Sequence, residues 1–308
     1  IGVASCSPRR HEPTFRQMIQ SVGLNPFLLG MANLREQCSW VHMNEPDAAT
    51  QKAVILVKMA VSRVRLLCPL AGERLPLTKR SLVIGGGIAG IQASLDLADN
   101  GYEVILVEKS PSIGGTMAQL DKTFPTNDCS MCIESPKLIE CARHPNIEIL
   151  TYTEVERVEG EAGDFRVTLI KKPRYVIEDR CTGCTTCVEY CPVKAPDPYN
   201  QNLSLNKAIH IYFSQAVPLI TYVDSETCLY FEDEKCNICM GVCKNEAIDL
   251  HQRAEKLEIE VGAIVLSPGF EIFDPGLRGD YGYGKMENVV TSLDFERLLC
   301  SPGPNVGE

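Results

Sequence analysis

The chain has 308 residues, enough for two or more domains, and is 44% hydrophobic and 23% charged, as expected of a soluble globular protein. Its 30 basic and 40 acidic residues give a net charge of −10, which argues against a nucleic-acid partner, because phosphates require a basic surface. We see neither a signal peptide nor an uninterrupted apolar stretch of about 18 residues, so we expect no membrane span.

The first expected unit covers residues 1–68. A buried strand is expected at residues 1–5 and a helix at 14–22. The glycine and proline of the segment 23–26 are expected to end this helix. A long amphipathic helix is expected at 48–67, and its apolar face consists of Val54, Val57, Ala60, Val61 and Val64. Residues 69–78 read as a linker. The chain opens on Ile1 within an apolar run and without an initiator Met, so we expect it to begin inside a domain.

The second unit begins at Lys79 and predicts an α/β fold. A short apolar strand at 82–84, a glycine loop, a helix ending near Asp99 and a strand at 103–107 form the opening β-α-β of a Rossmann-type domain. Further strands are expected at 147–151 and 165–171, which completes a first part at 79–173. A cysteine-rich segment at 174–251 then interrupts the pattern, and a buried strand at 258–266 resumes it within a last part at 252–308. The simplest account is a ferredoxin module inserted into a dinucleotide-binding domain.

The glycine loop predicts a site for the pyrophosphate of a dinucleotide. Gly85 allows a tight turn out of the strand, Gly87 lets the backbone approach phosphate, and Gly90 lets the helix pack closely on the sheet. Ile88 and Ala89 stand in the first turn of the helix, whose free N–H groups and positive dipole end face the phosphates. Glu108, at the end of the next strand, is expected to accept hydrogen bonds from the ribose hydroxyls.

The segment after Glu108 favours FAD over NAD. It resembles flavoproteins of the thioredoxin and glutathione reductase class, in which a second glycine pair lets the chain pass close to FAD. The segment 151–155 and the later turn at 267–269 fit the same layout. The further residues that this resemblance assigns to the cofactor are Lys109, Gly114, Gly115, Thr116, Val155 and Gly269.

Eight of the fifteen cysteines form two runs that predict iron–sulfur clusters. The first run has the bacterial ferredoxin spacing, Cys181, Cys184, Cys187 and Cys191, followed by Pro192. The second contains Cys228, Cys236, Cys239 and Cys243. Because the fourth cysteine of each run ligates the other cluster in two-cluster ferredoxins, we expect Cys243 to join the first three and Cys191 to join the second three, giving two [4Fe-4S] clusters.

The second run departs from the usual spacing. Seven residues rather than two separate Cys228 from Cys236, and Lys244 stands where proline is usual, so Cys228 is the least secure ligand. Zinc is the alternative metal, but a third cysteine two residues after the second is not a zinc-ribbon spacing. Cysteine-dense disulfide scaffolds are usually small and secreted, so these runs favour a reducing compartment, which we take to be the cytoplasm.

Four other cysteines are candidates for cofactor chemistry. Cys129 and Cys132 form a Cys-x-x-Cys pair that fits a redox dithiol, two cluster ligands or two buried structural thiols. Cys6 and Cys38 fit two of the four ligands of a further cluster, with plain buried thiols as the alternative. We assign no catalytic side chain, because the five histidines are scattered.

Taken together, these residues resemble the A subunit of heterodisulfide reductase. The resemblance extends over essentially the whole chain and rests on these strings: Cys6-Ser7-Pro8-Arg9, the segment 33–42 (NLREQCSWVH), the glycine loop, Phe124-Pro125-Thr126, Lys172-Pro173-Arg174-Tyr175 and Gln215-Ala216-Val217-Pro218. Compared with a whole family member, the chain lacks residues before its Ser-Cys-Ser-Pro motif and a later Gly-Asp strand that holds the ribityl chain of FAD, so we expect a fragment.

The resemblance implies an FAD- and iron–sulfur-containing oxidoreductase subunit of a soluble complex, in which flavin-based electron bifurcation occurs in some relatives. It implies partners such as ferredoxin, heterodisulfide reductase B- and C-like subunits, a hydrogenase, a formate dehydrogenase or an acyl-CoA reductase. The alternative is a subunit whose clusters conduct electrons between partners without flavin chemistry of its own.

Overall fold

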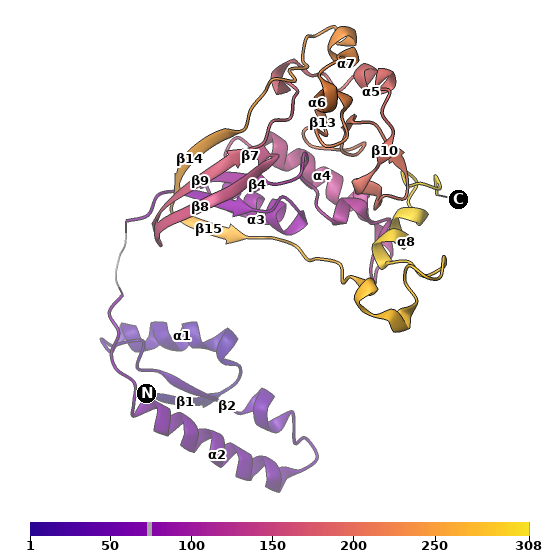
Figure 1. Cartoon of the computed structure of the whole chain (residues 1–308). Helices are drawn as coiled ribbons and strands as arrows, with labels where there is room; N and C mark the ends of the chain where they lie inside the picture. Colours follow the sequence, from indigo (N-terminus) through magenta and orange to yellow (C-terminus); the bar gives the residue numbers. More distant parts are fainter. Residues whose placement is uncertain (73–75, 308) are drawn as a thin grey trace. The chain divides into compact units, whose positions relative to one another are not determined.

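The computed structural model describes residues 1–72 and 76–307. Residues 73–75, which belong to the expected linker 69–78, and residue 308, which ends the expected last part, lie outside the described residues. The chain divides into two compact units, Ile1–Leu75 and Pro76–Glu308 (Figure 1).

The first unit is a small α/β arrangement. Strands β1 (Gly2–Ser5) and β2 (Gly30–Asn33) pair in parallel, and the other elements are α1 (Pro8–Ser21), the π-helix η1 (Arg35–Ser39) and α2 (Pro46–Val64). Helix α1 begins earlier than expected, at Pro8, because proline is tolerated in the first turn of a helix.

One expectation for this unit is wrong. Strand β1 is not buried, since its residues alternate between exposed and half-buried positions. Helix α2 has no buried residue, and Val54 and Val61 of its expected apolar face are 49% and 44% exposed. Apolar periodicity identified the helix, and its Val57, Ala60 and Val64 are half-buried, because α2 packs against β2, where a side chain added at Gly30 would lie 2.5 Å from Val64.

The second unit is built on a four-stranded parallel sheet with the order β15-β3-β4-β7 (Figure 1). Its strands are β3 (Arg80–Ile84), β4 (Glu103–Glu108), β7 (Ile147–Thr151) and β15 (Ala263–Leu266). Helix α3 (Ile88–Asp99) connects β3 to β4, and α4 (Ser130–Arg143) precedes β7. Between β4 and α4 lie η2 (Met117–Gln119) and the short pair β5 (Lys122–Thr123) and β6 (Asp128–Cys129).

Both faces of the parallel sheet are buried, which explains the continuous apolar runs in its strands. Because side chains alternate along a strand, Val83 and Leu106 face α3 and α4, while their neighbours face the opposite core. The residues of that second core are Leu82, Ile105, Val107, Val167, Leu169 and Val261.

The second core is covered by an antiparallel sheet with the order β14-β9-β8. Its strands are β8 (Thr153–Glu161), β9 (Asp164–Lys171) and β14 (Glu255–Val261). The expectation of one buried strand over 258–266 is therefore wrong. Gly262 separates β14 from β15, and a side chain there would lie 2.2 Å from the Thr78 carbonyl oxygen, so the chain changes sheets where no side chain fits.

The cysteine-rich segment lies between two strands that pair with each other, β9 and β14. It contains β10 (Ala195–Pro196), β11 (Leu205–Asn206), β12 (Ile209–Ile211), β13 (Thr221–Val223), η3 (Glu178–Arg180) and η4 (Pro198–Asn200). Its short helices are α5 (Thr186–Tyr190), α6 (Leu229–Asp233) and α7 (Ile238–Val242) (Figure 1).

This segment has a core of its own but also contributes to the main one. Tyr199 and Phe213 stack on each other at 5.2 Å and belong to the same buried cluster as Ile91 and Leu138 of the helices. After β15 the chain continues through η5 (Pro275–Leu277) and η6 (Gly279–Tyr281) to α8 (Ser292–Leu299). From α8, the fully buried Arg297 donates hydrogen bonds to the Asn200 side chain.

Candidate cofactor sites

The glycine loop turns sharply from β3 into α3. Gly85 has φ +104°, and a side chain there would lie 2.1 Å from the Ser267 carbonyl oxygen. A side chain at Gly90 would lie 1.9 Å from the Gly85 carbonyl oxygen, so these two positions require glycine for packing. At Gly87 the nearest atom to an added Cβ would be the Gly115 Cα at 3.9 Å, so this position has room.

Helix α3 offers free backbone donors at its start. Gly87 is its N-cap and no side chain caps it, so the first-turn N–H groups, among them those of Ile88 and Ala89, have no side-chain acceptor. A phosphate at this end would also meet the positive end of the helix dipole.

The second glycine pair lies beside this loop. The Gly114 N–H donates to the Gly86 carbonyl at 2.7 Å, and Gly114 forms a parallel bridge with Gly87. Both Gly114 and Gly115 have positive φ, at +130° and +61°. Two glycine segments that are 28 residues apart in the sequence thus form one backbone surface without side chains.

Glu108 ends β4 as a buried carboxylate that holds the loop in place. Its Oε2 accepts the Gly86 N–H at 2.6 Å, and its Oε1 accepts the Ser110 N–H at 2.8 Å. A carboxylate has about four acceptor sites, so each oxygen can accept one more hydrogen bond, for example from a ribose hydroxyl.

The remaining expected FAD residues lie at differing positions. Lys109 is exposed, Thr116 is half-buried at the start of η2, and Gly269 is exposed with φ +74°. Val155 packs against the second core, on the opposite face of the sheet from α3. Ser267, which the sequence indicated only as part of a turn, lies directly against Gly85 and Gly90.

The first expected ligand set lines one cavity. Cys181, Cys184 and Cys187 of the first run and Cys243 of the second all border it. Helices α5 and α7 pack together, so Cys187 within α5 and Cys243 at the end of α7 border the same cavity. Burial raises the pKa of the Cys187 thiol, whereas hydrogen bonds from Thr186 lower the pKa of the exposed Cys184.

The second expected set lines another cavity, bordered by Cys191, Cys228, Cys236 and Cys239. The unusual spacing now has a physical account, because the residues between Cys228 and Cys236 include α6, which leaves Cys228 as its N-cap and ends at Glu234 with φ +58°. Burial raises the pKa of the Cys239 thiol to about 12, so a neighbouring positive charge is needed to hold a thiolate there.

These cysteines surround cavities without converging on one point. Within residues 1–72 and 76–307, no group of three or more His, Cys, Asp or Glu side chains is close enough to hold a single metal ion. A zinc ion needs all of its sulfur ligands about 2.3 Å away, whereas a cluster of several irons needs thiolates spread around a larger volume.

In the first unit, Cys6 and Cys38 border one cavity of about 430 Å³, together with Arg35 and Ser39. The Cys38 Sγ donates to the Ala49 carbonyl at 2.9 Å, which is a contact of the protonated thiol. In the second unit, Cys129 and Cys132 are joined in a disulfide at the start of α4.

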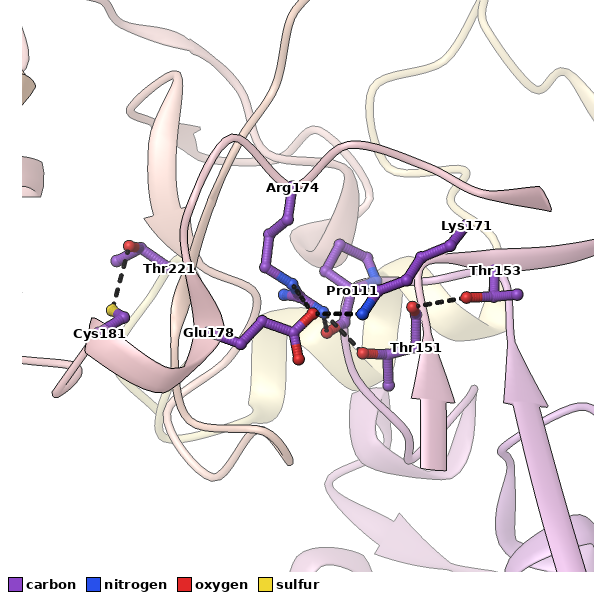
Figure 2. Close-up of polar contacts among 8 residues, drawn as sticks. All are labelled: Pro111, Thr151, Thr153, Lys171, Arg174, Glu178, Cys181 and Thr221. Carbon is purple, nitrogen blue, oxygen red and sulfur yellow. Dashed lines mark hydrogen bonds and ion pairs between the residues drawn. The ribbon is translucent and has the colours of Figure 1, made fainter. Parts of the chain in front are cut away.

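Sequence reasoning missed Arg174, which connects the two parts of the second unit (Figure 2). Its buried guanidinium donates to the Pro111 carbonyl at 2.8 Å and to the Thr151 hydroxyl at 2.6 Å, both on the nucleotide-binding side. Its Nε lies 3.6 Å from the carboxylate of Glu178, one turn before Cys181. No spacing rule identifies such a residue, because its partners are remote in the sequence.

Comparisons with known proteins agree with this geometry. Residues 82–184 match the family described as FAD dependent oxidoreductase, and residues 174–197 match the 4Fe-4S binding domain. These matches confirm the expected FAD-dependent oxidoreductase domain and at least one 4Fe-4S segment in a mixed α/β protein. Among solved structures, L-proline dehydrogenase from P. horikoshii is 25% identical over 33% of this chain and 21% of that chain, with a TM-score of 0.27, which is too low to carry an argument.

Similar sequences cover the whole chain. It is 50% identical over 308 residues to the A subunit of the H(2):CoB-CoM heterodisulfide,ferredoxin reductase of Methanothermobacter thermautotrophicus. It is 54% identical over 308 residues to an iron-sulfur A subunit, numbered 2, of the CoB--CoM heterodisulfide reductase of Methanopyrus kandleri. In both cases it covers 46% of the relative, so the chain spans about half the length of these curated relatives.

Proposed function

Because the chain is 50% and 54% identical over its whole length to two heterodisulfide reductase A subunits, we propose that it is the part of an oxidoreductase subunit that passes electrons between FAD and [4Fe-4S] clusters. The observation that carries this proposal is the pair of cysteine-lined cavities, each bordered by three cysteines of one run and the fourth cysteine of the other. Crossed ligation of this kind is the arrangement of two-cluster ferredoxins.

FAD fits the glycine surface of the second unit. The pyrophosphate would lie at the start of α3, where Gly87 and Gly115 present no side chains, and the ribose hydroxyls would donate hydrogen bonds to the Glu108 carboxylate. We assign Ile88, Ala89, Gly90 and Gly114 to the same surface, and Lys109, Thr116, Val155 and Gly269 to its periphery. When bound, FAD supplies a centre that exchanges one or two electrons.

The inserted segment fits two clusters. Cys181, Cys184, Cys187 and Cys243 would hold the first cluster, and the second would be held by Cys191, Cys228, Cys236 and Cys239. Buried thiols with raised pKa values, such as Cys239, become thiolates only beside a strong positive charge, which ferric and ferrous iron provide.

A third cluster in the first unit is a separate proposal. Cys6 and Cys38 border one cavity, which supports two ligands of a cluster whose other ligands lie elsewhere. The Cys38 thiol must then give up its hydrogen bond to Ala49 when it binds iron. Iron content that is unchanged in Cys38→Ala, with the fold intact, would reject this role.

Substrates and partners of the whole protein are inferred from the names of relatives. The relative from Methanosarcina mazei is named as the A subunit of a ferredoxin:CoB-CoM heterodisulfide reductase. We propose that this chain likewise acts in a complex, with ferredoxin and a disulfide as redox partners, and that its flavin bifurcates electrons. Masses of co-purifying subunits test this, since B- and C-like subunits, a hydrogenase, a formate dehydrogenase or an acyl-CoA reductase would each indicate a different pathway. No helix among the described residues has the length and apolar character to cross a bilayer.

The decisive experiment is cofactor analysis of the whole chain under anaerobic conditions. We expect at least about eight irons and eight sulfides per chain, since each cubane contains four of each. Cys191→Ala should remove the second cluster and leave the first, because crossed ligation separates Cys191 from its neighbours in sequence. Zinc in place of iron, or loss of the first cluster in Cys191→Ala, would contradict the assignment. A protein with clusters but no FAD would favour the alternative of a cluster-only conductor.

A further inference from the structure

A threonine outside both cysteine runs borders the first cluster cavity. Thr221, the first residue of β13, is 1% exposed and lines this cavity together with the four cysteines. The Thr221 Oγ1 lies 3.7 Å from the Cys181 Sγ and 3.9 Å from the Cys187 Sγ. Figure 2 draws the contact between Thr221 and Cys181. Among the described residues this hydroxyl has no other hydrogen-bond partner.

The fold holds Thr221 at this position from two sides. Strand β13 pairs with β12, with Thr221 opposite Ile211. Gly183, in the loop between the first two cysteines, lies so close to the Leu219 carbonyl oxygen that a side chain there would approach to 2.6 Å. The ligand loop and the segment leading to Thr221 are therefore in direct contact, and the hydroxyl cannot turn to solvent.

Iron would fix the direction of these hydrogen bonds. A cysteine bound to iron is a thiolate and has no proton to donate, so the Thr221 hydroxyl becomes the donor, and its one proton serves the Cys181 or the Cys187 sulfur. The first set gains further donors, because the Ala247 N–H lies 3.3 Å from the Cys243 Sγ and the Thr186 hydroxyl lies 3.6 Å from the Cys184 Sγ.

The second set has a different environment. In the described part of the chain, no side-chain hydroxyl lies within hydrogen-bond distance of the sulfurs of Cys191, Cys228, Cys236 or Cys239. Lys207 donates a hydrogen bond from its ammonium to the backbone carbonyl of Cys191 at 2.6 Å and not to sulfur. Backbone N–H groups of Tyr230 and Met240 lie near the Cys228 and Cys239 sulfurs, so the two cavities differ in the side-chain hydroxyls that face sulfur, and hydrogen bonds to the sulfurs are one of the features that set the potential of a cluster.

We propose that Thr221 raises the reduction potential of the first cluster above that of the second. An electron that enters the inserted segment would then rest on the first cluster, which is held by Cys181, Cys184, Cys187 and Cys243. This inference depends on the proposed function, since it requires both clusters. One-electron reduction adds negative charge to the cluster and its sulfurs, and a hydrogen-bond donor stabilises that state more than the oxidised one. Thr221 is thus a tuning residue that acts through the ligands.

The test is a redox titration of the whole chain, followed by electron paramagnetic resonance, on wild type, Thr221→Val and Thr221→Ser. Valine keeps the shape but removes the hydroxyl, so at a fixed potential we expect the reduced-to-oxidised ratio of the first cluster to fall about three- to tenfold, and a tenfold fall equals about 59 mV for one electron. Serine keeps the donor and should restore the wild-type value. Thr168→Val is the matched control, because Thr168 is buried in β9 and contacts no cysteine sulfur.

Iron and sulfide content measured first separates the two levels of the argument. Wild type without iron would reject the proposed function itself. Full iron content with the same first-cluster potential in wild type and Thr221→Val, or a first cluster that is not the more easily reduced one, would overturn the role of Thr221. If Thr221→Val fails to fold, Thr221→Ala removes the hydroxyl without added bulk and is compared with Thr221→Ser in the same way.

Discussion

Glu134 is a buried acid without a hydrogen-bond partner, and it should make the stability of the second unit depend on pH. It lies on α4, is 0% exposed, and neither carboxylate oxygen has a partner among the described residues. Burial raises its pKa to about 8 from an ordinary value of 4.5. Lys137, one turn later, donates to the Gln92 side chain and not to this carboxylate.

The sign follows from proton linkage. Below pH 4.5 Glu134 is protonated in both the folded and unfolded states, so it imposes no charge penalty. Between pH 4.5 and about 8 the folded protein keeps a proton that the unfolded chain has lost, so the free energy of unfolding falls as pH rises. The slope is about 1.4 kcal/mol per pH unit, and over the whole window the loss is on the order of 5 kcal/mol.

Glu134→Gln removes this titration while keeping the shape of the side chain. We expect it to be roughly 3 to 4 kcal/mol more stable relative to wild type at pH 8 than at pH 5. Urea unfolding followed by circular dichroism at a series of pH values measures the difference. Glu140→Gln is the matched control, because Glu140 lies exposed on the same helix. A Glu134→Gln difference that does not change with pH would refute the reasoning.

Three further predictions concern the cofactor sites. Gly87→Ala should fold normally but lose at least about tenfold in FAD affinity, measured by flavin fluorescence. Gly90→Ala should instead lower the free energy of unfolding by about 2 kcal/mol or more, since its Cβ would lie 1.9 Å from a carbonyl oxygen. Equal effects of the two substitutions would contradict the assigned roles. Arg174→Met should cost about 2 to 4 kcal/mol in urea unfolding because buried carbonyl and hydroxyl partners lose their donor, and Arg174→Lys, which cannot reach both partners, should recover only part; a neutral Arg174→Met would refute this. In iron-free protein at about pH 7.5, iodoacetamide followed by mass spectrometry should modify Cys184 before Cys187 and Cys239, because the pKa of Cys184 is lowered and the others are raised; the reverse order would count against the described burial.

Features with local causes could be predicted from the sequence. The glycine loop, α3 and the acid that ends β4 follow one another along the chain, and the structure has α3 at Ile88–Asp99 and β4 at Glu103–Glu108. Strand β7 lies at the expected residues 147–151 for the same reason, since a buried parallel strand is a short apolar run. The similarity to heterodisulfide reductase A subunits was also predictable, because the shared motifs are strings of consecutive residues.

Features that depend on distant partners could not be predicted. An apolar run over 258–266 reads as one strand, and only the close approach of Thr78 to Gly262 shows why it becomes two. The long spacing between Cys228 and Cys236 departs from the usual ferredoxin pattern, and the structure explains it by placing α6 between the two cysteines. Thr221 and Glu134 stand in no motif, and the string that contains Arg174 says nothing of its partners, so the roles of these residues depend on neighbours that only the fold brings together.

The inserted segment and the nucleotide-binding domain form one folding unit, which constrains how electrons pass between them. Tyr199 and Phe213 of the segment are part of the main core, and Arg297 of α8 donates to Asn200 while its guanidinium lies 4.8 Å from the Tyr199 ring centroid. Arg174 adds hydrogen bonds from the segment to Pro111 and Thr151. Moving the segment would expose buried aromatic rings and leave buried polar groups without partners, which is costly. We therefore expect the two cysteine-lined cavities to keep a fixed distance from the glycine loop. Differences in reduction potential between the clusters, such as the one we attribute to the Thr221 hydroxyl, would then direct electrons within the second unit, and domain motion would not.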